Sequence, residues 1–318
     1  MEKRQLGRSA LMVSKLGLGC MSLGTDAKQA RTIIEAALDE GVNYFDTADL
    51  YDYGENEKIV GQTLKSVRDQ VIIATKVGNR WNDKKDGWHW DPSKSYIKEA
   101  VKDSLRRLGT DYIDLYQLHG GTIDDPIEET IEAHGGTIDD PIEETIEAFE
   151  ELKAEGIIRY YGLSSIRPNV IRAYAKHSDI VSVMMQYNLL DRRPEEEALP
   201  LLHEHQISVV TRGPVAKGLL STRWREKADD SGYLNYSYPE LKNLLSSIED
   251  YFQNTRTLTE VALQFNLSHP AVAAVVVGAS SVEQLKENVR AVNRPPLSEE
   301  EYSFLKKMTK TDLYEQHR

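Results

Sequence analysis

The sequence predicts a (β/α)8 barrel, and three observations lead to this prediction. Short runs rich in Val, Ile, Leu and Tyr alternate with longer segments of helical period, the pattern of βαβ units in a parallel sheet. This alternation occurs eight times along the 318 residues. Eight units favour a closed barrel over an open doubly wound sheet, which more often has fewer strands. Because no Pro-, Gly- or Ser-rich linker divides the chain, we expect residues 1–318 to form one α/β domain.

The expected strands alternate with helical segments along the whole chain. They are Lys15–Cys20, Tyr44–Ala48, Val71–Lys76, Tyr112–His119, Tyr160–Ser164, Val181–Asn188, Ile207–Arg212 and Ala274–Gly278. Two of the helical segments have a clear end, because Ala27–Glu40 is followed by Gly41 and Tyr96–Leu108 by Gly109. Glycine just after a helix accommodates the left-handed conformation that ends many helices.

Two connections after expected strands are unusually long and rich in aromatic residues. The first, Gly78–Pro92, carries Trp81, Trp88, His89 and Trp90, and the second, roughly Gly213–Asn254, carries Trp224, Tyr233, Tyr236 and Tyr238. Both belong to the C-terminal face of the barrel, where barrel enzymes keep their chemistry. The aromatic residues either line an apolar substrate pocket or only anchor the loops, and we favour the pocket.

A perfect internal repeat follows expected strand four. The segment HGGTIDDPIEETIEA occurs at His119–Ala133 and again, identical in all fifteen positions, at His134–Ala148. Such identity indicates a recent or engineered tandem duplication, because a solenoid repeat diverges and needs several copies to stack. The duplication is therefore expected to be an insertion and not an architecture.

The apolar pattern predicts which copy forms the barrel helix. In the second copy Ile142, Ile146, Phe149 and Leu152 form one continuous apolar stripe, entered through Pro141 in the first turn. The first copy would break its stripe at His134-Gly135-Gly136. We therefore expect the second copy to pack on the barrel and about fifteen residues from Gly120 to be extruded at the C-terminal rim.

Composition narrows the classes of partner and compartment. The chain has 39 Lys and Arg against 51 Asp and Glu, a net charge of −12, which disfavours nucleic acid and anionic lipid as partners. The single cysteine, Cys20, excludes an internal disulfide, and no Cys/His cluster has zinc-ligand spacing. No apolar run is long enough to span a membrane, and the N-terminus lacks the apolar core of a signal peptide. We expect a cytoplasmic protein without structural metal.

Four polar residues at or near the ends of three consecutive expected strands suggest an active site. Asp46 and Tyr51 belong to the end of strand two, Lys76 ends strand three and His119 ends strand four. An aspartate beside a lysine would keep the ammonium charged, and a nearby ammonium lowers the pKa of a phenol toward that of a general acid. An imidazole can donate a hydrogen bond to a substrate carbonyl.

Each of the four residues alone has a structural explanation. Asp46 could be a satisfied carboxylate, Tyr51 a loop aromatic, Lys76 a solvated strand end and His119 a strand cap. Their combination at one barrel mouth is much more specific. It predicts a proton donor, Tyr51, with groups that tune it and orient a carbonyl.

Here the chain resembles the aldo-keto reductases, in particular the bacterial stress-type reductases and the potassium channel β-subunits. The segments that carry the resemblance are GVNYFDTADLYDYGENEKIVGQTL, VIIATKVG, YIDLYQLH, GLSS, MQYNLLDRR, TRGPVAKGLLS and VVVGASSVEQLKENV. They cover essentially the whole chain, and only the duplication departs grossly from the pattern. The resemblance implies a catalytic tetrad of Asp46, Tyr51, Lys76 and His119.

The resemblance also implies a binding site for NADP(H). It assigns Ser164 and Gln186 to hydrogen bonds with the nicotinamide carboxamide, and Arg212 to a position where relatives often stack an aromatic ring on the nicotinamide. A guanidinium plane can also stack. The helix that opens after strand eight would bind the adenosine 2′-phosphate and adenine, and helix N-termini suit phosphate; the implied residues are Gly278, Ser280, Gln284 and Asn288. The alternative for this segment is a plain helix cap by Ser280 or Ser281.

The function implied is reduction of an aldehyde or ketone to an alcohol by hydride transfer from NADPH, in a protein expected to be a monomer with a small-molecule carbonyl substrate. The alternative within the family is an NADPH-binding regulatory barrel with little or no turnover, as among the channel β-subunits. A glycosidase with paired carboxylates is a third possibility. It is disfavoured because Asp46 and Asp49 lie on one turn and the cofactor segment would have no purpose.

Overall fold

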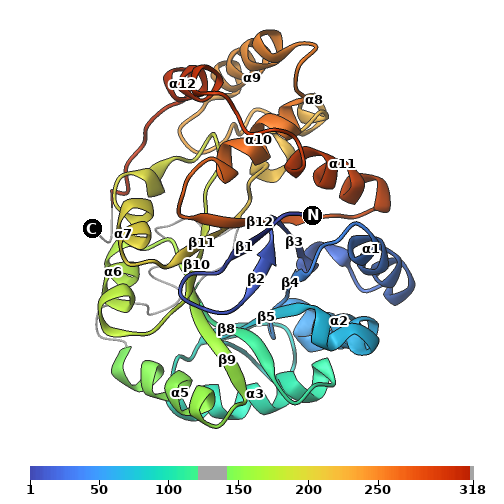
Figure 1. Ribbon diagram of the computed structural model, residues 1–318, viewed down its shortest axis with the longest axis vertical. Helices are drawn as coiled ribbons and strands as arrows, with labels where there is room; N and C mark the ends of the chain where they lie inside the picture. The colour runs from blue at the N-terminus through green and yellow to red at the C-terminus, as the bar shows by residue number, and fades with distance from the viewer. Residues whose placement is uncertain (121–141, 316–318) are drawn as a thin grey trace.

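The structure is a computed structural model that describes residues 1–120 and 142–315. Eight parallel strands close into a barrel, which confirms the predicted fold class (Figure 1). In chain order they are β3 (Leu16–Gly19), β4 (Tyr44–Asp46), β5 (Ile72–Val77), β8 (Ile113–His119), β9 (Ile158–Ser164), β10 (Ser182–Gln186), β11 (Ser208–Arg212) and β12 (Val272–Gly278). Pairing of β12 with β3 closes the ring.

Helices surround the barrel on its outside (Figure 1). They are α1 (Ala27–Asp39), α2 (Glu55–Leu64), α3 (Lys94–Leu108), α5 (Ile142–Ala154), α6 (Pro168–His177), α7 (Ala198–Glu204), α10 (Leu258–Leu267) and α11 (Val282–Val292). Three further helices, α8 (Trp224–Lys227), α9 (Tyr238–Phe252) and α12 (Glu299–Met308), gather at one side of the ring. The positive φ of Gly41, +81°, and of Gly109, +64°, agree with the predicted helix ends.

An N-terminal hairpin, which is not among the strands expected from the sequence, closes the bottom of the barrel. It consists of β1 (Lys3–Gln5) and β2 (Met12–Ser14), and Leu6, Leu11 and Val13 join the buried cluster of the barrel interior. The amide of Gly7 donates to Ser208 Oγ at 2.7 Å, at the first residue of β11. The hairpin therefore seals the end opposite to the strand carboxyl ends, where the site lies.

The first described helix after β8, α5, contains residues of the second repeat copy, and these residues pack as the apolar stripe predicts. Phe149 and Leu152 of α5 are buried, while Ile142 and Ile146 are half-buried against the same core. The Phe149 ring stacks on Tyr161 with the ring centroids 5.3 Å apart. Residues 121–141, with Pro141, His134 and the expected extrusion, lie outside the described residues.

The two long aromatic connections contain regular structure in addition to loops. The first folds into a hairpin of β6 (Asn79–Trp81) and β7 (Trp88–Trp90), and the second contains α8 and α9. The capping box of Ser237 and Glu240 begins α9, a signal present in the sequence. Trp224 is only 2% exposed within the core, so a substrate-lining role for it is wrong.

Two further observations concern expected absences and the lone cysteine. Among the described residues, no helix is both long and apolar enough to cross a membrane, and no group of three potential metal ligands occurs. Cys20, in the 3-10 helix Cys20–Leu23 after β3, is fully buried, and this burial raises the pKa of its thiol.

Candidate active site

The carboxyl ends of the barrel strands bring the predicted site residues onto one rim. Asp46, Lys76 and His119 lie on β4, β5 and β8, and Ser164, Gln186, Arg212 and Gly278 lie on β9 to β12. Cross-strand pairing places His119 beside Ser164 and Gln186 beside Arg212. The predicted proton-handling residues and the predicted cofactor residues therefore form two arcs of the same ring.

Tyr51 reaches the rim through a tight turn after β4. Its amide donates to the carbonyl of Ala48 at 3.2 Å, and the amide of Asp49 donates to the carbonyl of Lys76 at 3.3 Å. Asp52 and Tyr53 follow with positive φ angles of 49° and 51°. These hydrogen bonds hold the turn against the end of β5 and so fix the position of the Tyr51 backbone.

Lys76 is the centre of the proton-handling arc. Its Nζ donates to Asp46 Oδ1 at 2.6 Å, to the Thr47 carbonyl at 2.7 Å and to the Tyr51 hydroxyl at 3.2 Å. The Lys76 side chain is 1% exposed. All three ammonium protons therefore have acceptors, which is the arrangement that a buried ammonium needs to remain charged.

Burial acts on the pKa values of this arc in opposite directions. Burial works to lower the pKa of Lys76, but the Asp46 carboxylate and the Tyr51 hydroxyl outweigh it and raise that pKa. For Tyr51 burial is the largest effect and raises the pKa of the phenol, although Lys76 acts to lower it. The expectation of a lowered phenol pKa is therefore wrong in sign, because the effect of burial exceeds that of the ammonium.

His119 faces Tyr51 across the rim as a neutral imidazole. The two rings meet edge to face with centroids 6.0 Å apart. Burial, reinforced by Lys76 and Arg212, holds the pKa of His119 well below its ordinary value. A neutral imidazole carries one N–H, and its buried Nδ1 has no hydrogen-bond partner among the described residues. His119 can therefore donate to an oxygen without bringing a charge.

Sequence reasoning missed residues that support the Asp46 carboxylate and its turn. Gln117 Nε2 donates to Asp46 Oδ2 at 3.4 Å, and Thr47 Oγ1 donates to Asn56 Oδ1 at 2.7 Å. Gln117 precedes His119 by two residues on β8. Because side chains alternate along a strand, that spacing puts both on the inner face, a signal that could have found it.

The cofactor arc contains one cation, Arg212, among the residues predicted to bind the cofactor. Arg212 is half-buried, and its Nη1 donates to Gln186 Oε1 at 3.3 Å. Within the described residues no carboxylate lies at ion-pair distance from it, and burial lowers the pKa of its guanidinium. The exposed part of the Arg212 guanidinium is available to stack on a planar group or to bind an anion. Arg212, with Gln186 on the neighbouring strand and Ser164 one strand further, thus fits a polar, aromatic or anionic group such as a nicotinamide nucleotide.

The segment after β12 begins α11 with a conventional cap. Ser281 Oγ accepts from the Gln284 amide at 3.2 Å, and Gln284 Oε1 accepts from the Ser280 amide and hydroxyl at 2.9 and 3.1 Å. Ser280 and Gln284 thus contact each other, and Asn288 is buried one turn further along. The N-terminus of this eleven-residue helix suits a phosphate, whereas Ser280 itself contributes no charge.

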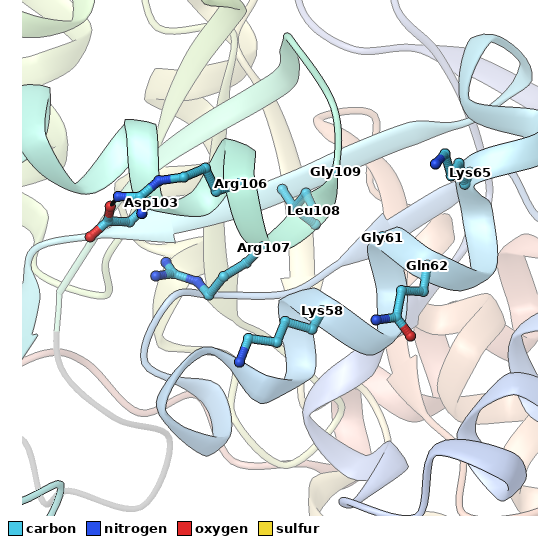
Figure 2. Close-up of a pocket in the computed structure, with 9 residues that line it drawn as sticks. All are labelled: Lys58, Gly61, Gln62, Lys65, Asp103, Arg106, Arg107, Leu108 and Gly109. Carbon is cyan, nitrogen blue, oxygen red and sulfur yellow. Dashed lines mark hydrogen bonds and ion pairs between the residues drawn. The ribbon is translucent and has the colours of Figure 1, made fainter.

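A cavity of about 500 Å³ lies away from this rim, between α2 and α3 (Figure 2). It is lined by Lys58, Gly61, Gln62, Lys65, Asp103, Arg106, Arg107, Leu108 and Gly109. Arg106 and Arg107 occupy the last turn of α3 and Lys65 caps α2, where cations complement the helix dipole. Because helix C-termini repel anions, this basic lining is explained by the helices and does not indicate an anion site.

Comparison with known proteins shows the family to which the chain belongs. Residues 15–310 match the aldo/keto reductase family. The chain is 57% identical to an uncharacterised oxidoreductase, YqkF, from Bacillus subtilis, over all of both chains. It is 30% identical to an NADH-specific methylglyoxal reductase from Escherichia coli, over 92% of this chain and 94% of that protein.

A solved structure is similar over its full length. The aldo-keto reductase AKR11C1 from Bacillus halodurans, in its holo form, superposes with a TM-score of 0.91 at 59% identity, covering 100% of this chain and 99% of that one. The resemblance found in the sequence motifs is thus confirmed by the match over most of the chain and by the superposed fold. The chain belongs to the aldo/keto reductase family of oxidoreductases.

Proposed function

We propose that this protein reduces aldehydes or ketones to alcohols with NADPH, using Asp46, Tyr51, Lys76 and His119 as its catalytic residues. One observation carries the proposal. The Tyr51 hydroxyl lies 3.2 Å from the buried Lys76 ammonium, on the rim that also carries Ser164, Gln186 and Arg212. This arrangement supports the proposal, because the Tyr51 phenol and the residues proposed to bind the cofactor lie at one barrel mouth.

When bound, the dinucleotide supplies the hydride for the carbonyl carbon. Ser164 and Gln186 would bind its carboxamide, and Arg212 would lie against its nicotinamide ring. Gly278, Ser280, Gln284 and Asn288 would bind the adenosine end and its 2′-phosphate. The free backbone N–H groups at the start of α11 favour that phosphate.

The chain's own residues supply the proton and stabilise the charge that its transfer leaves behind. Tyr51 donates its hydroxyl proton to the carbonyl oxygen as that oxygen gains negative charge. Lys76 stabilises the phenolate that remains, and Asp46 keeps Lys76 charged through their 2.6 Å contact. Neutral His119 donates a hydrogen bond that orients the carbonyl oxygen and stabilises its developing charge.

The preference for NADPH over NADH is part of the proposal. It rests on the helix N-terminus after β12 and on the family motif there. The relative described as NADH-specific makes the comparison of the two cofactors informative. We expect a modest preference for NADPH, because Ser280 places no cation at this end of the helix.

Steady-state assays with a panel of aldehydes and ketones, each with NADPH and with NADH, test the proposal. We expect oxidation of NADPH with formation of one alcohol per cofactor consumed. Binding measured by quenching or energy transfer of NADPH fluorescence separates the outcomes. Binding without turnover on any carbonyl would instead favour a regulatory barrel, and absence of binding would overturn both.

A further inference from the structure

A buried ion pair to which the family resemblance assigned no role lies directly behind the cofactor arc. Arg193 Nε and Nη2 donate to Asp191 Oδ1 and Oδ2 at 2.8 and 2.9 Å, a two-pronged contact with both carboxylate oxygens. The Asp191 side chain is completely buried and that of Arg193 is 13% exposed. Such charge-assisted contacts are stronger and more directional than neutral ones.

The same carboxylate also holds Gln186. Asp191 Oδ2 accepts a hydrogen bond from Gln186 Nε2 at 2.8 Å, while Gln186 Oε1 accepts from Arg212 at 3.3 Å. Flipping the amide would turn its oxygen toward a carboxylate and its NH2 group toward a guanidinium. Two charges of opposite sign therefore select one orientation of the Gln186 amide.

We propose that Asp191 and Arg193 are positioning residues that orient Gln186, so that Gln186 offers an acceptor and not a donor to the cofactor. This inference rests on the proposed function, since it needs a nicotinamide at the rim. An acceptor-only partner favours the carboxamide orientation that turns its NH2 group toward Gln186. The pair thereby restricts which face of the nicotinamide is turned toward Tyr51.

The C-terminal segment supports the pair from the opposite side. The Arg193 guanidinium lies over the ring of Tyr314, 4.9 Å from its centroid, and Tyr314 is 5% exposed.

Tyr233, from the second long connection, places its hydroxyl 3.5 Å from Gln186 Nε2 and 3.2 Å from Asn188 Nδ2. Both side-chain nitrogens, Gln186 Nε2 and Asn188 Nδ2, therefore already have acceptors within the protein. The group of Gln186 that can bind the cofactor is its oxygen, Oε1.

The neighbouring turn provides a matched control. Glu195 forms a similarly buried ion pair with Arg192 at 2.8 Å, with side chains 10% and 3% exposed. It contacts Tyr187 and Lys306, and no hydrogen bond or ion pair joins it to Gln186 in the described part of the chain. Glu195→Gln therefore removes a comparable charge from the same segment without altering the surroundings of the Gln186 amide.

The experiment compares Asp191→Asn, Glu195→Gln and the parent protein in two ways. Dissociation constants are measured for NADPH and for adenosine 2′,5′-bisphosphate, which lacks the nicotinamide. Transfer of deuterium from NADPH labelled on either face at C4 is then measured in the product alcohol. For Asp191→Asn we expect NADPH binding to weaken at least about tenfold with bisphosphate binding unchanged, and some transfer from the second face.

The outcomes separate this proposal from the one on which it rests. Unchanged NADPH binding and facial selectivity in Asp191→Asn, with an active parent, would overturn the positioning role alone. Equal weakening of both ligands in Asp191→Asn and Glu195→Gln would show a purely structural role and would also overturn it. A parent that binds neither ligand would overturn the proposed function itself, and the positioning role with it.

Discussion

The two arcs of the barrel rim differ in whether their charged side chains are paired within the protein. In the proton-handling arc the Lys76–Asp46 pair is closed at 2.6 Å, with side chains 1% and 5% exposed. In the cofactor arc Arg212 is half-buried and makes a 3.3 Å contact with the neutral Gln186. The proposed proton donor is therefore held in place by the fold, whereas Arg212 has no carboxylate at ion-pair distance among the described residues.

This difference has an energetic consequence. Removing one partner from a buried ion pair leaves an uncompensated charge, so the first arc should respond to substitution in both stability and chemistry. The second arc should respond mainly in ligand binding. The following substitutions test this contrast, from the largest expected effect to the smallest.

Tyr51→Phe removes the donor proton and keeps the ring. We expect kcat for carbonyl reduction to fall by roughly 10²–10⁴-fold, the usual contribution of a positioned general acid. NADPH binding, measured by fluorescence, should stay within about twofold of the parent because Tyr51 belongs to the other arc. Turnover close to that of the parent would remove Tyr51 from the mechanism.

Lys76→Met leaves Asp46 buried without its counter-charge. Unfolding in urea should show a loss of about 3–5 kcal/mol of stability, typical of a broken buried pair. Arg212→Met is the control from the second arc, where no carboxylate loses a partner, and it should be much less destabilised. Equal losses in the two variants would contradict the difference between the arcs.

Ser280→Arg adds a cation beside the expected 2′-phosphate. A charge-assisted contact of roughly 1.5–3 kcal/mol would raise the preference for NADPH over NADH by about 10- to 100-fold. The ratio of kcat/KM values for the two cofactors measures it. An unchanged ratio would mean that the start of α11 does not face the 2′ position.

His119 should make the stability of the fold depend on pH. Its pKa in the folded protein lies well below the ordinary 6.5, so below pH 6.5 the unfolded chain binds a proton that the folded protein excludes. Stability is therefore complete above pH 6.5 and declines on acidification, with a slope of at most about 1.4 kcal/mol per pH unit. Urea unfolding at several pH values measures this slope.

Two variants isolate the contribution of this imidazole. His119→Asn should flatten the acid slope, whereas substitution of the exposed His177 by Asn should leave it as in the parent. If both variants kept the full slope, another group would be responsible for the acid sensitivity.

The smallest effect on stability is expected from deletion of one copy of the repeat. The duplication lies between His119 and Ser164, and deletion of Gly120–His134 restores a single copy of the repeat. We expect a change in unfolding free energy below about 1 kcal/mol, because the entropy of loop closure varies slowly with length. His134→Ala should likewise lose little activity, unlike His119→Ala. A deletion variant that failed to fold would show that the first copy contributes to the barrel.

The strands and the rim residues were predictable because their signals are local. Buried parallel strands appear in the sequence as apolar runs. Lys76 and His119 stand out because they are polar residues at the ends of such runs, where barrel enzymes carry their active sites. The pattern of Ile142, Ile146, Phe149 and Leu152 likewise predicted the face of α5 that packs on the barrel, where Phe149 and Leu152 are buried.

Other features depend on contacts that the sequence does not display. The pairing of Asp191 with Gln186 joins side chains on either side of a turn, and the raised pKa of Tyr51 follows from burial more than from its neighbour. Trp224 looked like a pocket residue because aromatic side chains suit both pockets and cores. Only the packed structure distinguishes these two environments.

The burial of Cys20 affects how the protein responds to reagents that alkylate or oxidise cysteine. Alkylation and oxidation of cysteine require an accessible thiolate, and burial denies this thiol both access and ionisation. Since Cys20 is the only cysteine of the chain, the folded protein presents no sulfhydryl target to peroxides or to reactive carbonyl electrophiles. Inactivation by such compounds would therefore require prior unfolding or attack on another kind of side chain.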